Sequence, residues 1–242
     1  METTNLKSAV GLGPALTLCA LLLFSVACSS AEKLWDQYNR DAEAAHQQNR
    51  YPEAEKQWLA AIRESEKLRP DDPRLSSGLN SLGVLYRDVH RYAEAEPLLR
   101  RSLAIREKTL PADDPELFTS LNNLAALYSA ERKYSDAEAI YKRTLAIMEK
   151  ASGPENPAVA TSLNSLAQVY LLEEKYKEAE PLYRRALAIR EKALGPEHPA
   201  VALSLKNYAA MLRITHQDDK AAKLEARAEA IRERRSQGKS AR

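Results

Sequence analysis

The chain has 242 residues, of which 44% are apolar and 29% are charged, and its 36 basic and 34 acidic residues leave a formal net charge of +2. This near balance, with the two signs interspersed along most of the chain, gives no indication of a nucleic-acid partner, and we expect none. Few glycines and aromatic residues, against abundant Ala, Leu, Glu, Arg and Lys, favour helices over strands. We expect an all-α protein.

The first segment, residues 1–27, has one basic residue, Lys7, before an uncharged apolar run. A positive charge, an apolar stretch and a small residue before a break are the pattern of a secretory signal peptide. The stretch Ser25-Val26-Ala27-Cys28 resembles the lipobox of bacterial lipoproteins, in which the cut precedes a cysteine that carries the lipid. The commonest lipobox has leucine where Ser25 stands. The resemblance implies a lipid-anchored protein with Cys28 as its first mature residue.

An uncleaved transmembrane anchor is the alternative, because about 20 apolar residues can cross a hydrocarbon core. Both alternatives export the body and hold it at a membrane. Ser29 and Ser30 resemble the residues that follow the cysteine in lipoproteins sorted to the outer membrane, where the body would face the periplasm. A linker of only 28–34 would keep the folded body close to that membrane.

The body repeats with a period of 42 residues, and such a repeat decides the architecture. Equivalent positions recur without a gap in four copies: Leu79, Leu121, Leu163 and Leu205; Pro73, Pro115, Pro157 and Pro199; Ala95, Ala137, Ala179 and Ala221. An earlier copy, around Tyr51, is degenerate and one residue out of step. We expect five units, at about 35–70, 71–112, 113–154, 155–196 and 197–235, and a basic disordered tail at 236–242.

Each unit has the apolar spacing of two helices joined by a short turn. Leu121, Leu124, Ala125 and Tyr128 follow one another at i, i+3, i+4 and i+7, which places them on one helical face. Asp114 before Pro115 is typical of a helix N-terminus. Each unit is therefore a helical hairpin, and neighbouring hairpins must stack to bury both of their faces.

These leucine, alanine and tyrosine positions resemble the tetratricopeptide repeat, and the 42-residue unit ending "ALAIREKALGPEHP" is similar to the kinesin-light-chain type. The resemblance covers nearly all of the mature chain. It implies a right-handed solenoid of about five hairpins, with a concave groove lined by the first helix of each unit. It also implies a scaffold that binds protein or peptide segments. A repeat of this type does not make the chain a motor subunit, and the lipobox resemblance favours a bacterial envelope instead.

The resemblance places the residue after the first leucine of the first helix of a unit in the groove. These residues are Asn80, Asn122 and Asn164, with Asn39 at this position in the degenerate copy and Lys206 in the last copy. An amide both donates and accepts, so spaced asparagines can bond an extended peptide backbone. Arg87 and Arg213 are expected to face the same groove and make its ends cationic. Alternatively, the asparagines are solvated or tie neighbouring helices together.

Nothing in the sequence points to catalysis, a cofactor, a metal or a small-molecule substrate. The four histidines lie at different repeat positions, and no pair has the spacing of a helical metal site. His198 and the acidic pairs that end at Asp72 and Asp114 lie in equivalent turns of different repeats, just before the proline of the next helix. We expect these residues to cap the helix N-terminus. We expect a non-enzymatic envelope scaffold, or alternatively a structural subunit of a membrane-associated assembly that uses its outer helix faces.

Overall fold

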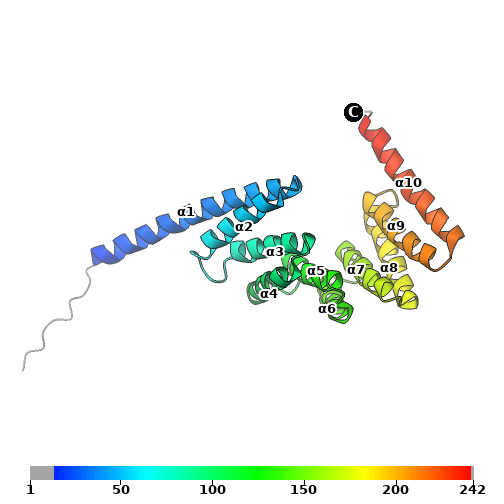
Figure 1. Ribbon diagram of the computed structural model, residues 1–242, viewed down its shortest axis with the longest axis horizontal. Coiled ribbons are helices and arrows are strands. Elements are labelled where there is room, and N and C mark those ends of the chain that lie inside the picture. The colour runs from blue at the N-terminus through cyan, green and yellow to red at the C-terminus, as the bar shows by residue number, and fades with distance from the viewer. Residues whose placement is uncertain (1–13, 241–242) are drawn as a thin grey trace, which may run out of the picture. The chain divides into compact units, whose positions relative to one another are not determined.

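A computed structural model describes the backbone of residues 14–240 and the side chains of residues 29–236. Over the described backbone the chain consists of ten helices and no strand, which confirms the all-α prediction (Figure 1). Helices alternate as the first (A) and second (B) members of consecutive hairpins. The chain divides into two compact units, the first ending at Gly78 and the second beginning at Leu79.

The first unit contains α1 (Pro14–Gln47), α2 (Tyr51–Ser65) and the start of α3 (Pro73–Asp88). Helices α1 and α2 pack against each other as a hairpin. Trp58 of α2 is buried, and the His46 ring of α1 lies 5.5 Å from it, centroid to centroid. Aromatic packing therefore holds this hairpin together.

The second unit holds the rest of α3 and seven further helices. These are α4 (Tyr92–Thr109), α5 (Pro115–Ala130), α6 (Tyr134–Ser152), α7 (Pro157–Leu172), α8 (Tyr176–Leu194), α9 (Pro199–Ile214) and α10 (Asp218–Ser240). From α4 onward each helix packs on the next, and the A helices also touch directly, α5 on α7 and α7 on α9 (Figure 1). The alanines shared by the B helices are fully buried, because the helices approach closely there: Ala95, Ala137, Ala179 and Ala221.

The A helices begin at the same kind of cap in each copy. Asp114 Oδ1 accepts a hydrogen bond from the backbone N–H of Glu116 at 2.8 Å, and Asn156 Oδ1 accepts one from Ala158 at 2.9 Å. His198 does the same through Nδ1, at 3.1 Å from the Ala200 nitrogen. The capping role expected of this turn is confirmed, with a histidine ring replacing the usual carboxylate or amide.

The five A–B turns share one backbone conformation. Each has a non-glycine residue at positive φ: Asn49, His90, Arg132, Glu174 and His216. The N–H that follows bonds back across the helix end, as from Lys133 to the Tyr128 carbonyl at 2.8 Å. This is a Schellman-type closure, which usually uses glycine because a left-handed residue with a side chain is strained.

The structure describes most of the expected linker and C-terminal tail, and only part of the expected signal peptide. The expected linker at 28–34 is helical, since α1 runs through it, and α10 continues to Ser240 through most of the expected disordered tail. Residues 1–13 of the expected signal peptide lie outside the described residues, as do the side chains of residues 14–28, including Cys28. Among the described residues, no helix combines the length and apolar character needed to cross a membrane.

Candidate functional site

A cavity of about 310 Å³ opens on the exposed side of the A helices in the second unit. We call it the A-helix groove. Its lining comes from α5 (Ala126 and Ser129), α6 (Tyr141), α7 (Asn164, Ser165, Gln168, Val169 and Leu172) and α9 (Asn207). Three consecutive A helices contribute to it, and α7 contacts both α5 and α9.

Asn164 is the predicted groove residue that lines this cavity. Its side chain is only 7% exposed, and its Nδ2 donates to the Ala160 carbonyl at 3.0 Å and to Ser204 Oγ at 3.3 Å. Its Oδ1 is buried and has no hydrogen-bond partner. A buried acceptor without a donor costs about 1–3 kcal/mol.

Asn80 and Asn122, the predicted groove residues of the two preceding units, form hydrogen bonds with neighbouring A helices. Asn80 Oδ1 accepts from Asn123 Nδ2 at 3.0 Å, joining α3 to α5. Asn122 Oδ1 accepts a longer bond, 3.4 Å, from Ser162 Oγ of α7. With the Asn164–Ser204 bond these contacts make a ladder between A helices. The interhelical ties that the sequence left open as an alternative are therefore present.

Asn39 lies in the first unit and is also engaged. Its Nδ2 donates to Glu43 at 2.8 Å, and its Oδ1 accepts from Trp58 Nε1 at 3.2 Å. The amide thus links α1 to the buried tryptophan of α2.

The predicted cations differ in their surroundings. Arg87 is held by Asp88, with Nη2 at 2.8 Å from Oδ1. Burial raises the pKa of Tyr141, and both a hydrogen bond with Ser165 and the nearby charge of Arg87 oppose this rise. Tyr141 lines the groove, whereas Arg87 does not.

The other two cations belong to the last hairpin. Arg213 is bound by two carboxylates, at 2.6 Å from Glu225 and 2.9 Å from Asp218, and these hydrogen bonds raise its pKa. Its charge is directed to α10. Lys206 is exposed and lines a different cavity, formed by α9 and α10. The structure does not bring Lys206 and Arg213 into the groove with Asn164.

Sequence reasoning missed two buried arginines. Arg106 and Arg190 are 4% and 8% exposed, and each donates through Nη1 to a serine of the next A helix, Ser120 at 2.8 Å and Ser204 at 2.7 Å. Burial lowers the pKa of both guanidinium groups. The sequence contains a signal for these contacts, because in both repeats the arginine lies fourteen residues before the serine that it binds.

Within the described part of the chain no group of His, Cys, Asp and Glu side chains could hold a metal ion. The groove offers amides, hydroxyls and one phenol, without the paired nucleophile and base that catalysis requires. Such a surface is suited to hydrogen bonding with a polypeptide.

The sequence profile of the tetratricopeptide repeat matches residues 38–108, 116–192 and 165–234. The chain belongs to the tetratricopeptide repeat family. Proteins of this family are generally non-enzymatic scaffolds suited to protein–protein interaction, and no catalytic family is indicated. No curated protein sequence matches the chain.

Solved structures of such repeats are similar to this one. A Podosopora anserina protein with nearly identical TPR-like repeats of kinesin light chain type shares 26% identity at a TM-score of 0.72, over 86% of this chain and 98% of that one. BtubC (BKLC) from P. vanneervenii shares 23% identity at a TM-score of 0.70, over 88% and 92%. A Rap protein complexed with competence and sporulation factor shares 15% identity at 0.68, over 82% of this chain and 54% of that one.

Proposed function

We propose that the protein is a non-enzymatic envelope scaffold that binds an extended segment of a partner protein in the A-helix groove. The observation that carries the proposal is the buried, unpartnered Oδ1 of Asn164 in the groove lining. A backbone N–H of a bound segment would supply the missing donor. Docking would then remove an existing cost as well as form a bond.

The rest of the lining supports a polypeptide as ligand. Gln168 and Asn207 bear amides that can donate and accept, and Leu172, which is 47% exposed, offers an apolar contact. An extended segment presents alternating N–H and C=O groups and needs this mixture. The groove would select by backbone shape and small apolar contacts more than by net charge.

We further propose that the scaffold is exported and anchored by lipid on Cys28, at the outer membrane and facing the periplasm. The support is the resemblance of Ser25-Val26-Ala27-Cys28 to a lipobox and the two serines that follow. Substitution Cys28→Ala should abolish incorporation of labelled fatty acid and leave the higher-mass precursor. Undiminished labelling would contradict the anchor and leave the groove proposal intact.

The groove is tested by crosslinking in the native cells, with a photoreactive residue at position 168. We expect capture of a discrete partner there and none from position 177, which lies exposed on α8. Asn164→Ala should reduce capture. Ser204→Ala is the control, because it removes the same interhelical bond, together with the bond from Arg190 to that hydroxyl, but leaves the Asn164 Oδ1 in place.

Capture from position 177 alone would contradict the groove proposal and favour an assembly formed through the outer helix faces. Equal loss of capture in the Asn164→Ala and Ser204→Ala proteins would assign the asparagine a structural role only.

A further inference from the structure

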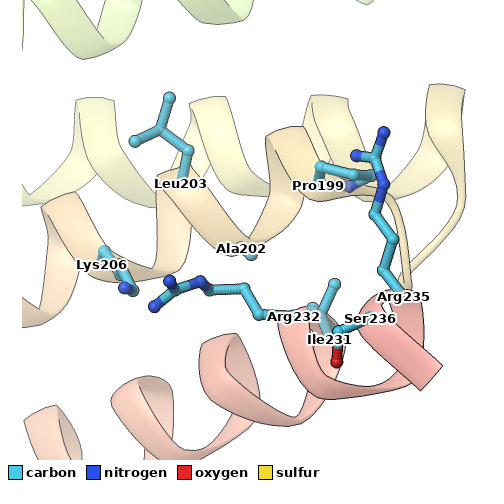
Figure 2. A pocket seen from close by; sticks show the side chains of 8 residues that line it. All are labelled: Pro199, Ala202, Leu203, Lys206, Ile231, Arg232, Arg235 and Ser236. Carbon is cyan, nitrogen blue, oxygen red and sulfur yellow. The ribbon is translucent and has the colours of Figure 1, made fainter. Parts of the chain in front are cut away.

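A second and larger cavity, of about 480 Å³, lies at the C-terminal end of the second unit between α9 and α10 (Figure 2). We call it the end cavity. Its lining residues are Pro199, Ala202, Leu203, Lys206, Ile231, Arg232, Arg235 and Ser236. The floor is apolar, and the three long side chains around it are all cationic. The end cavity is separate from the A-helix groove.

The 42-residue period shows what the equivalent surface binds elsewhere in the chain. One repeat earlier, the corresponding surface of α7 and α8 is covered by the next A helix, α9. Arg190 of α8, the equivalent of Arg232, donates there to the Ala200 carbonyl at 3.3 Å and to Ser204 Oγ at 2.7 Å. The end cavity therefore has the form of a surface on which a further A helix packs.

The last repeat departs from its copies at the residues that line this surface. Leu203 stands where the preceding repeat has Thr161, whose hydroxyl accepts a hydrogen bond from Arg190 at 3.2 Å. The Leu203 residue is 54% exposed. Lys206 replaces Asn164. The first change adds a large apolar side chain to this surface, and the second adds a positive charge to a cavity that Arg232 also lines.

We propose that the end cavity binds an amphipathic helix of a partner protein, which packs as an additional A helix and carries an acidic residue at the position equivalent to Ser204. Asn164 and Arg190 converge on Ser204 within the chain, at 3.3 and 2.7 Å. Lys206 and Arg232 are their equivalents. Two cations directed at one position select a carboxylate where the internal interface has a hydroxyl.

The side chains are placed for such a contact. Figure 2 shows the Arg232 side chain of α10 extending across the cavity toward Lys206 of α9. Arg232 also donates to Glu229 of its own helix at 3.1 Å, in a pair that is half exposed. An exposed pair of this kind contributes little and can be exchanged for a carboxylate on the docked helix.

A second copy of this chain does not supply that carboxylate. The residues equivalent to Ser204 in the other A helices are Gln37, Gly78, Ser120 and Ser162, none of them acidic. The occupant is therefore a helix from a different protein, with leucine-sized apolar residues on one face to cover Leu203 and Ile231. This surface works independently of the groove.

The test uses the full chain and three fluorescent 16-residue peptides with the sequence of α9. One is the parent, one carries Ser204→Glu and one carries Ser204→Lys. In fluorescence anisotropy the glutamate peptide should bind about tenfold more tightly than the other two, the effect of one charge-assisted contact. In the Lys206→Glu, Arg232→Glu protein the order should reverse in favour of the lysine peptide.

Two control proteins separate the end cavity from other surfaces. Lys177→Glu reverses an exposed charge on α8 and should leave all three affinities unchanged. Leu203→Ser restores a hydroxyl residue like those of the other copies and should weaken all three peptides without changing their order. Both substitutions are at exposed positions, and circular dichroism verifies that the proteins stay folded.

Three results would overturn the proposal: no saturable binding of the glutamate peptide, equal affinity for the three peptides, or an unchanged order in the charge-reversed protein. Self-association abolished by Leu203→Asp would assign the end cavity to a second copy. Displacement of the glutamate peptide by phosphatidylglycerol vesicles, but not by phosphatidylcholine vesicles, would assign it to an anionic lipid surface.

Discussion

Arg190 and Arg232 occupy the same position in consecutive repeats and have opposite environments. Arg190 is 8% exposed and bonds three groups on two A helices, Thr161, Ala200 and Ser204. Arg232 is exposed and bonds Glu229 of its own helix. The difference arises because α9 covers the first arginine and no helix in the described chain covers the second.

The comparison shows that the neighbour, more than the residue type, decides what a repeat position contributes. A guanidinium buried without a carboxylate is costly unless every donor is satisfied, and the serine, threonine and carbonyl around Arg190 perform that function. The same side chain at the end cavity keeps its hydration. Equivalent substitutions should therefore have very different effects at the two sites.

The largest expected effect is the difference between Arg190→Ala and Arg232→Ala. The first removes the three hydrogen bonds of a buried side chain and leaves unfilled space between α8 and α9, so the free energy of unfolding should fall by about 2–4 kcal/mol. The second should change it little. Urea unfolding of both proteins measures the difference, and similar losses would show that Arg190 is not an interface residue.

Arg190→Met sharpens this comparison, because the middle repeat already uses methionine there. Ser162 Oγ lies 3.5 Å from Met148 Sδ, in the place where Ser204 meets Arg190. Replacing a buried charge by an apolar side chain of similar length is often neutral. The methionine protein should recover most of the stability that alanine loses, and a loss as large as that of alanine would show that the charge itself is needed.

The next effect concerns the amide ladder and its cationic last member. Asn164→Ala should lower the free energy of unfolding by about 1 kcal/mol, since one interhelical hydrogen bond is lost. Lys206→Ala should leave it nearly unchanged, because Lys206 is exposed. Thermal unfolding followed by circular dichroism checks both. A stable Asn164→Ala protein would mean that the 3.3 Å contact with Ser204 contributes nothing.

The hairpins could be predicted from the sequence because their determinants are local. Asp114 and Pro115 start a helix through contacts within two residues, and the apolar period follows from one helix face. Because the pattern recurs every 42 residues, the same prediction holds for every copy.

The environment of the site residues could not be predicted in the same way. Asn122 and Asn164 bond serines 40 residues further along the chain, and Arg190 is buried by a helix that begins nine residues later. A pattern within one repeat contains no information on which neighbour covers it. The expected inward direction of Arg213 depended on the same missing information, because Glu225 and Asp218 belong to the following helix.

Substitutions at the positive-φ residue of the A–B turn should affect the last two hairpins equally, because the backbone strain is confined to each turn. Glu174 and His216 have φ values of 59° and 57°, where a side chain is unfavourable. Glu174→Gly and His216→Gly should each raise the free energy of unfolding by about 1 kcal/mol. A gain at Glu174 alone, measured by urea unfolding, would show that the last hairpin unfolds separately from the rest.

The smallest effect is a difference in pH dependence between Tyr183 and its equivalent in the last hairpin, Glu225. Burial raises the pKa of Tyr183 to about 12, so its contribution is present below its ordinary value of 10.0 and is lost as the pH rises through 12. A hydrogen bond from Arg213 lowers the pKa of Glu225, so its contribution is present above the ordinary value of 4.5 and is lost as the pH falls through the lowered value. Tyr183→Phe should therefore flatten the alkaline side of the Tm profile, and Glu225→Gln the acid side. Because the Glu225 side chain is 44% exposed, the acid change should shrink in high salt, whereas the alkaline change at the buried tyrosine should persist.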